Sequence, residues 1–112
     1  MEKIREVILY KHYFKNFFRD LSPLAKSKVD YVLFLLTHIE RIPEKFLKHI
    51  EGHKGLYELR IEAGNNIFRV FCCFDKTKIV VLLNAFQKKT QKTPSSEISL
   101  AIKLMDEYFN NI

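Results

Sequence analysis

Glycine and proline are scarce in this chain, and no long apolar run interrupts it. Three glycines and three prolines among 112 residues, with 47% hydrophobic and 29% charged residues, are typical of an ordinary folded domain. This composition excludes disorder, collagen-like repeats and low complexity. The longest apolar run, Tyr31 to Leu36, is far shorter than a membrane span, and the N-terminus lacks the apolar core of a signal peptide. We therefore expect residues 1–112 to form a single cytoplasmic domain.

Cysteine and histidine are too few, and too poorly spaced, for the common metal and redox sites. Cys72 and Cys73 are adjacent in a strand-like run, so their side chains point to opposite faces and should not pair. We interpret them as small core residues in a reducing compartment. His49 and His53 lack a third ligand at suitable spacing, and Gly52 disfavours a helix there. The sequence therefore predicts neither a metal site nor a cofactor.

Acidic residues are outnumbered by basic ones. The chain has 13 Asp and Glu against 19 Lys and Arg, a net charge of +6 and a pI near 9.4. This balance favours a polyanionic partner, because neutralisation of phosphates by Lys and Arg dominates nucleic-acid affinity. Charge alone leaves a second interpretation open, since many small basic proteins bind no polyanion.

The first part of the chain predicts a strand followed by two helices. Residues 6–10 (EVILY) predict a short strand, and the apolar spacing of residues 12–21 predicts a helix. Ser22 and Pro23 are a typical start for a second helix, with Ser as the N-cap and Pro at the first helical position. We expect this second helix to extend from residue 24 to about residue 42.

The second helix has an apolar face much wider than a single stripe. Such a face is either buried deeply in a helical hairpin or docks a partner. Pro43 ends this helix. Residues 44–55 mix apolar and charged side chains, and we expect a connector with about one turn of helix.

Three strands with short turns follow. Residues 56–62 alternate, with Tyr57 and its apolar neighbours on one face and the charged residues on the other, which predicts a half-exposed antiparallel strand. Residues 64–66 (GNN) supply typical hairpin chemistry. Residues 67–74 predict the second strand, and the third begins at Ile79.

A final helix completes a predicted α+β domain. Thr93 and Pro94 predict its start, and Glu97 suits the dipole of its first turn. The predicted order is β-α-α-β-β-β-α. It describes an antiparallel β-sheet with an N-terminal helical hairpin and a C-terminal helix packed on it, and residues 6–10 as an edge strand.

The third strand of this sheet ends in a basic, polar segment. Residues 79–86 are apolar apart from Asn84, which is typical of a strand buried on both faces. Residues 87–93 contain no apolar side chain. Functional groups are often carried at such a strand end by a rigid scaffold. The amines and amides of this segment are Gln87, Lys88, Lys89, Gln91 and Lys92.

Arg69 is a lone charge in an otherwise apolar strand. Its burial is costly unless the guanidinium reaches water, a carboxylate or a bound anion. A pair with Glu58 or Glu62 across the hairpin, or an extended side chain that passes the sheet edge, would satisfy it structurally. Arg60 lies on the polar face of the neighbouring strand and can converge on Arg69. Together with the lysines that follow the third strand, these arginines favour a bound phosphodiester.

Such a site can cleave RNA without a metal. The 2′-hydroxyl attacks the adjacent phosphate, while the protein positions it, moves protons and stabilises the phosphorane. Arginines suit the stabilising role, and lysines in a cationic setting suit proton transfer. No histidine follows His53, so a histidine-pair mechanism is disfavoured, and no nucleophile elbow is present. The candidate catalytic residues are Arg60, Arg69, Lys88 and Lys89, and the candidate RNA-binding residues are Tyr57, Glu58, Gln91 and Lys92.

Four segments in the last half of the chain resemble the RelE/ParE superfamily of toxins, and especially its phage-derived HigB-type branch. They are GLYELRI (55–61), FRVFCCF (68–74), IVVLLNAFQKKTQKTP (79–94) and EISLAIKLMDEY (97–108). The resemblance implies a RelE-like fold and a toxin of a type II toxin-antitoxin system that cleaves mRNA on the ribosome. It also implies a cognate antitoxin, commonly a helix-turn-helix protein of the HigA-like kind.

The resemblance also assigns residues. It implies that Arg69 is the strand arginine of the FRV motif, that Arg60 is the ELR arginine, and that Lys88 and Lys89 are the basic residues after the last strand. The chain departs from relatives that use a histidine or a terminal tyrosine in proton transfer. Tyr108 lies on the apolar stripe of the last helix, so we transfer no catalytic role to it, and the acid and base stay open.

Two other functions remain alternatives. One is non-enzymatic inhibition of DNA gyrase of the ParE kind, against which the strand arginine and the lysine cluster argue. The other is a non-catalytic RNA-binding module, whose affinity should fall steeply with salt while RNA stays intact.

Overall fold

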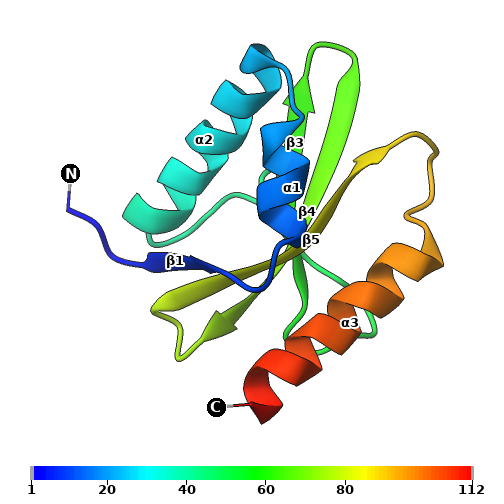
Figure 1. The fold of residues 1–112 in the computed structure, drawn as a ribbon. Helices are drawn as coiled ribbons and strands as arrows, with labels where there is room; N and C mark the ends of the chain where they lie inside the picture. The colour runs from blue at the N-terminus through cyan, green and yellow to red at the C-terminus, as the bar shows by residue number, and fades with distance from the viewer. Residues whose placement is uncertain (1, 112) are drawn as a thin grey trace.

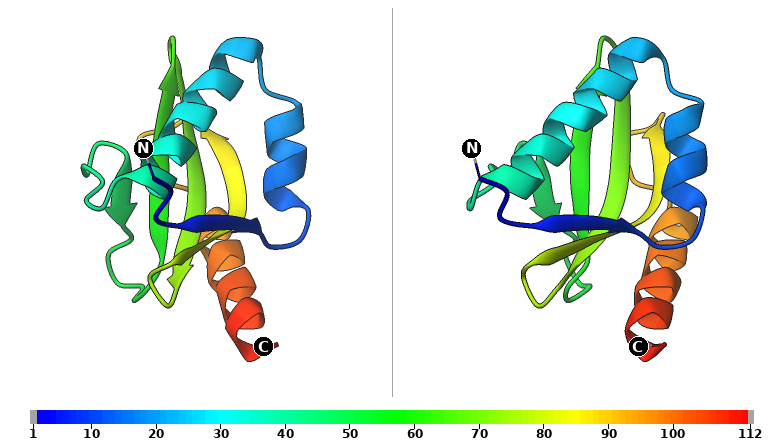
Figure 2. Two further views of the ribbon diagram at one scale, coloured as in Figure 1. Left: turned by 90° about the vertical axis from the view of Figure 1, so that its left-hand side faces the viewer. Right: turned by 60° about the vertical axis from the view of Figure 1, so that its left-hand side comes forward.

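The computed structural model describes residues 2–111, which form one mixed β-sheet and three helices (Figure 1). The elements are β1 (Glu6–Leu9), α1 (Tyr13–Arg19), α2 (Pro23–His38), β2 (Leu47–His49), β3 (Tyr57–Ala63), β4 (Asn66–Asp75), β5 (Ile79–Lys88) and α3 (Ser95–Asn110). Helices α1 and α2 form a hairpin, and α3 lies apart from it and leads to the C-terminus (Figure 2). None of the helices within residues 2–111 combines the length and apolar character needed to cross a membrane.

The strand order in the sheet is β1-β5-β4-β3-β2. Strands β3, β4 and β5 form the predicted antiparallel meander, and β2 adds to β3 in antiparallel orientation. The first strand occupies the predicted edge, but it pairs with β5 in parallel, so the sheet is mixed. The α+β class is confirmed, and the elements follow the predicted order apart from the added strand β2. The direction of β1 depends on where the helical hairpin returns the chain, which no local pattern encodes.

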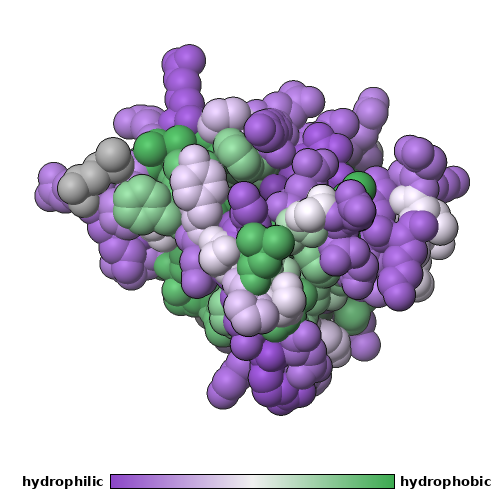
Figure 3. Space-filling view, turned by 90° about the horizontal axis from the view of Figure 1, so that it is seen from above, coloured by the Kyte–Doolittle hydropathy of each residue, from purple (hydrophilic) through white to green (hydrophobic). Residues whose placement is uncertain are grey.

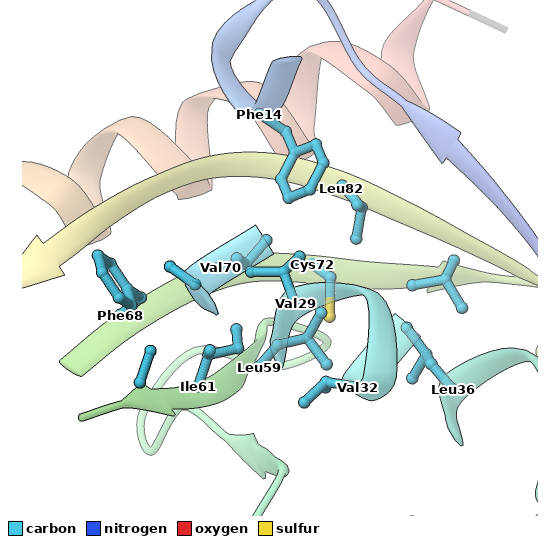
Figure 4. Packing of buried hydrophobic residues seen from close by; sticks show 13 residues of the cluster. Phe14, Val29, Val32, Leu36, Leu59, Ile61, Phe68, Val70, Cys72 and Leu82 are labelled. Carbon is cyan, nitrogen blue, oxygen red and sulfur yellow. The ribbon is translucent and has the colours of Figure 1, made fainter. Parts of the chain in front are cut away.

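Each face of the sheet carries its own core. One core joins α1 and α2 to the sheet, and Figure 4 shows Val29, Val32 and Leu36 of α2 packed over the strands, with Phe14 of α1 near Leu82. The other core lies under α3, which packs on β4 and β5. Its buried residues are Leu56, Phe71, Cys73, Val81, Leu83, Ala101 and Leu104.

Strand β5 is buried on both faces, as its composition predicts. Residues 80–83 are fully buried, and they alternate between the two cores. The two cysteines divide in the same way, with Cys72 in the α1–α2 core and Cys73 in the α3 core, and both are free thiols. Burial raises the pKa of both, to about 12 for Cys73. The interpretation as core residues is confirmed.

A β-bulge changes the alternation near the end of β5. The register jumps between Val70 and Cys72, so that Leu83 and Asn84 of β5 both lie opposite Phe71. Asn84 is therefore directed to α3, where its amide donates to the backbone oxygen of Glu97 at 3.0 Å and to the Glu97 carboxylate at 3.1 Å. This contact ties the first turn of α3 to the strand that carries the lysines.

The start of α2 is as predicted, and its end is not. The Ser22 hydroxyl accepts a hydrogen bond from the backbone N–H of Ala25, with Pro23 in the first turn. The helix ends at His38, earlier than predicted, and Arg5 binds the carbonyls exposed at its end. These carbonyls belong to Leu36, Ile39 and Glu40, at 2.8–2.9 Å.

Two further local predictions are only partly right. The connector after Pro43 contains the predicted turn, in which the N–H groups of Phe46 and Leu47 both donate to the Pro43 carbonyl. It also contains the short strand β2, whose pairing with β3 satisfies its backbone. The last helix begins at Ser95 with Pro94 in the N-cap position, and it has no side-chain cap from Thr93. Glu97 does lie in its first turn, as predicted.

Candidate nucleic-acid interface

Two arginines lie opposite each other on the central hairpin. The register of β3 and β4 pairs Arg60 with Arg69, which places both side chains on the face of the sheet that carries α3. Arg69 is 5% exposed, while Arg60 is half-buried. The predicted convergence of these two residues is therefore what the structure shows.

A buried carboxylate lies between the two guanidinium groups. Glu58 is 6% exposed, and its Oε2 atom is 3.4 Å from Nε of Arg60 and 3.5 Å from Nε of Arg69. Arg69 Nη1 also donates to the carbonyl of Phe68 at 3.1 Å. The geometry at Arg69 Nε is too poor for a hydrogen bond, so this contact is electrostatic. One carboxylate thus serves two cations, and the pair keeps a net positive charge.

Burial is the main influence on the pKa of Arg69. It lowers this pKa, Glu58 opposes the change, and the charge of Arg60 adds to it. An arginine nevertheless stays protonated at neutral pH. Glu58 compensates only part of the repulsion between the two arginines, and a second anion bound beside them would reduce the rest.

The arginines form one wall of an open cleft of about 770 Å³. The end of β5 forms the other wall, because the register sets Lys88 opposite Ile67 and Phe86 opposite Arg69. Four cations and no acidic residue line this cleft. The lining residues are Arg60, Asn65, Asn66, Ile67, Arg69, Gln87, Lys88, Lys89, Thr90 and Gln91.

The structure brings most of the predicted site residues together. Arg60, Arg69, Lys88, Lys89 and Gln91 all line the cleft. Glu58 lies beneath it, in contact with both arginines rather than on the surface of the cleft.

Two predicted RNA-binding residues are elsewhere. Tyr57 is on the other face of the sheet, where it packs against the α1–α2 core and meets the rings of His49 and Phe74 edge-on. This location corrects the grouping of Tyr57 with the arginines, and strand alternation is its cause. Lys92 is exposed in the loop before α3, outside the residues that line the cleft.

Sequence reasoning missed several polar residues of the cleft. Asn65 and Asn66, which the sequence predicts as turn residues, also form the rim of the cleft at the hairpin tip. The Gln87 amide donates to Oδ1 of Asn66 at 3.2 Å and so links the two walls. Their place in the sequence could have indicated this role, because both asparagines directly precede the predicted strand that carries Arg69.

Proton-transfer candidates other than the lysines lie outside the cleft. The Tyr108 hydroxyl donates to Oδ2 of Asp75 at 2.7 Å, at the far end of β4, and this bond raises the pKa of Tyr108. Both cysteine thiols are buried. Within residues 2–111, no three His, Cys, Asp or Glu side chains are grouped so that they could hold a metal ion.

A family model decides where this chain belongs. The model for phage-derived Gp49-like proteins matches residues 16–106, which include the helical hairpin as well as the segments around the cleft. The chain belongs to the Gp49-like family. No curated protein sequence matches this Gp49-like protein significantly.

A solved structure supports the fold independently. The Gp49-like protein is similar to a chain in the crystal structure of the archaeal RelE–RelB complex from Pyrococcus horikoshii OT3, with a TM-score of 0.55 and 22% identity. The match covers 80% of this chain and 99% of that chain. At this identity the likeness shows the fold alone. The predicted resemblance is confirmed to this extent: the chain belongs to the phage-derived Gp49-like family and has a RelE-like fold.

Proposed function

We propose that this Gp49-like protein is the toxin of a type II toxin-antitoxin system and an endoribonuclease that cleaves mRNA on the ribosome. The observation that carries this proposal is the cleft, in which Arg60, Arg69, Lys88 and Lys89 converge with no acidic residue in the lining. A cationic cleft over a rigid sheet suits a phosphodiester, because charge-assisted hydrogen bonds to phosphate need fixed donors. The family and the RelE fold support the same function.

The proposed reaction uses the substrate's own nucleophile. The 2′-oxygen attacks phosphorus as its proton leaves, the bond from phosphorus to the 5′-oxygen breaks, and the 5′-oxygen takes up a proton. The products are a 2′,3′-cyclic phosphate and a 5′-hydroxyl. Arg69 and Arg60 would stabilise the charge on the phosphorane, because their guanidinium groups are held before the substrate arrives. Lys88 and Lys89 are the proposed proton-transfer residues, since they line the same cleft.

The proposed partner is a cognate antitoxin. The similar archaeal RelE was crystallised with RelB, and the predicted partner here is a helix-turn-helix protein of the HigA-like kind. Its neutralising action would be visible as restored growth when the two genes are expressed together. A complex that retains full RNA cleavage would contradict neutralisation by covering the cleft.

Brief induction of the protein, followed by mapping of the 5′ ends of cellular mRNA, tests the activity. Wild type should create new 5′ ends within translated regions and arrest growth. Arg69→Ala should abolish both effects while its circular dichroism remains that of a folded domain. Arg19→Ala is the matched control, because Arg19 is an exposed arginine that pairs with Asp20 and does not line the cleft.

The same experiment separates the alternatives. Inhibition of gyrase would induce DNA-damage signalling and leave mRNA intact. A non-catalytic RNA-binding module would produce neither new mRNA ends nor damage signalling. Either result would refute the proposed endonuclease.

A further inference from the structure

A second hollow borders the same two arginines on the α2 side of the sheet. It has a volume of about 510 Å³ and lies between α2, the loop before β2 and the outer edge of β3. Its lining residues are Lys28, Tyr31, Val32, Lys45, Phe46, Arg60, Ile61, Glu62 and Arg69. The end of the molecule with the α1–α2 turn also carries hydrophobic residues among hydrophilic ones (Figure 3).

The hollow is open because strand β2 is short. The pairing of β2 with β3 ends where Leu47 lies opposite Leu59, and one further hydrogen bond joins the Arg60 N–H to the Phe46 carbonyl at 2.8 Å. Beyond that point β2 does not cover the edge of β3. Arg60 and Arg69 can therefore be reached from this edge as well as from the first cleft.

The two hollows meet at the arginine pair, since Arg60 and Arg69 line both. This arrangement matters for an endonuclease. A phosphodiester inside an RNA strand continues in both directions, so a strand held at the arginines needs a path on either side. The first cleft supplies one path, and the hollow beside α2 supplies the other.

The chemistry of the hollow matches a nucleotide. Lys28 and Lys45 bring two further positive charges, against the single carboxylate of Glu62. Tyr31 is 53% exposed, and its ring meets Phe46 edge-on at 6.0 Å between centroids. An exposed ring that shares a hollow with lysines is the combination with which proteins hold single-stranded nucleic acid, since bases stack and phosphates pair with cations.

We propose that this hollow binds the nucleotide that adjoins the scissile phosphate, with its base stacked on Tyr31 and its phosphate paired with Lys28 and Lys45. This inference rests on the proposed function for the place of the scissile phosphate. It adds a binding site for single-stranded RNA to the α2 side of the molecule. A base stacked on Tyr31 would contact a ring whose position is restrained by its edge-on contact with Phe46.

Binding of single-stranded oligoribonucleotides tests the proposal. Methylation of every 2′-oxygen prevents cleavage, and graded lengths of oligomer at low salt give the affinity by fluorescence anisotropy. Tyr31→Ala should weaken the binding of every oligomer from the dinucleotide upward about 5-fold or more, the lower range for loss of one stacked base, and should leave the binding of sulfate, which has no base, unaffected. Phe34→Ala is the matched control, because Phe34 is a 46% exposed ring of α2 that stacks on His38 and does not line the hollow.

Lys28, one of the two lysines of the hollow, gives a second readout. Lys28→Ala should lower the slope of log affinity against log salt by about 0.7, the value for one phosphate contact on a single strand. Lys15→Ala, on an exposed face of α1, should leave the slope unchanged. Equal affinities of Tyr31→Ala and Phe34→Ala for all lengths would overturn the inference, and so would failure of wild type to bind RNA.

Arg69→Ala separates this inference from the proposed function. Loss of binding in Arg69→Ala with no effect of Tyr31→Ala would leave the catalytic cleft standing and refute the second site. An effect of Tyr31→Ala without one of Arg69→Ala would support the hollow as an RNA site and refute the cleft. If Tyr31→Ala instead releases a co-purified antitoxin and leaves RNA affinity unchanged, the hollow is a protein-docking surface and the inference is wrong.

Discussion

Glu58 contacts both arginines of the pair through a single carboxylate oxygen atom. Its Oε2 approaches the Nε atoms of both guanidinium groups, so it restrains both side chains. Mutual repulsion of two adjacent cations is reduced, and the pair still attracts an anion. We therefore propose that Glu58 positions the arginines and does not contact RNA directly.

Neutralisation of Glu58 should have opposite effects on stability and on anion binding. Glu58→Gln keeps the size of the side chain but leaves two arginines without a counter-charge, which should cost about 1–3 kcal/mol of unfolding free energy. Anion affinity should rise, because the local potential becomes more positive. Urea denaturation with and without added sulfate measures both effects, and sulfate should restore part of the lost stability. Asp106→Asn, on the exposed side of α3, should change neither quantity appreciably.

Tyr108 provides a pH-dependent test of the C-terminal helix. Its hydrogen bond to Asp75 raises the pKa of Tyr108 above the usual value of about 10. The bond stabilises the protonated phenol, so its contribution is fully present below the pKa of the unfolded chain and is lost as pH rises through the higher folded pKa. Tyr108→Phe should be less stable than wild type by about 1 kcal/mol at pH 8. The difference should shrink above about pH 10, as thermal denaturation across pH would show.

The position of α2 depends on a residue far from it in sequence. Arg5 donates to three carbonyls at the C-terminal end of this helix, where backbone oxygens otherwise lack partners. The backbone N–H groups of Ile4 and Arg5 also bond to Thr37. The segment before β1 therefore clamps the end of the helix whose other residues line the second hollow.

Substitution of Arg5 should loosen this clamp. Arg5→Ala should cost about 1–3 kcal/mol of stability, because several charge-assisted hydrogen bonds are lost. Arg5→Lys should recover only part of this cost, since an ammonium group lacks the planar fork of donors. Amide hydrogen exchange should rise in the last turn of α2 and not in α3. Lys3→Ala serves as the control, because Lys3 makes only an exposed ion pair with Glu6.

The β-bulge sets the direction of the loop that carries Lys89. Without it, Asn84 would point to the opposite face of the sheet from Leu83. The bulge directs both to α3, and the amide of Asn84 then anchors Glu97. The Oδ1 atom of Asn84 is buried and has no hydrogen-bond partner among the described residues, so only the donor side of this amide is used.

The whole molecule leaves one end of its sheet available for a ligand. Helices cover both faces of β4 and β5, and the hairpin tip, the end of β5 and the loop before α3 together enclose the cleft. Four cations of this basic chain share the single cleft at this end. This concentration should steer and hold a polyanion.

Salt should accordingly weaken RNA binding steeply. Pairing of the four cleft cations with phosphates of a single strand predicts a slope of up to about −3 for log affinity against log salt, at about 0.7 for each phosphate neutralised. Lys88→Ala and Lys89→Ala should each reduce the magnitude of this slope by about 0.7. Lys103→Ala, on the exposed side of α3, should not. Anisotropy titrations between about 50 and 200 mM salt measure the slopes, and a flat dependence in wild type would contradict phosphate binding in the cleft.

The sequence by itself determined the elements and the most telling site residue. Hydrophobic periodicity predicts that β5 is buried on both faces. Cap and turn chemistry predict the helix start at Ser22–Pro23 and the turn at Gly64. All of these patterns act over a few residues. The lone Arg69 in an apolar strand also required an anion or a carboxylate on local grounds alone. Alternation even predicted that Tyr57 lies on the face opposite Arg60, which its grouping with the site overlooked.

Only the tertiary structure decided what those elements meet. The parallel pairing of β1, the strand β2, the clamp by Arg5 and the bulge at Asn84 all join residues distant in sequence. The place of Glu58 between both arginines, and the second hollow on the α2 side, likewise depend on register and packing. Local sequence patterns specify which face of a strand a side chain occupies. Long-range packing decides which groups from distant segments share that face, and the composition of the cleft depends on this packing.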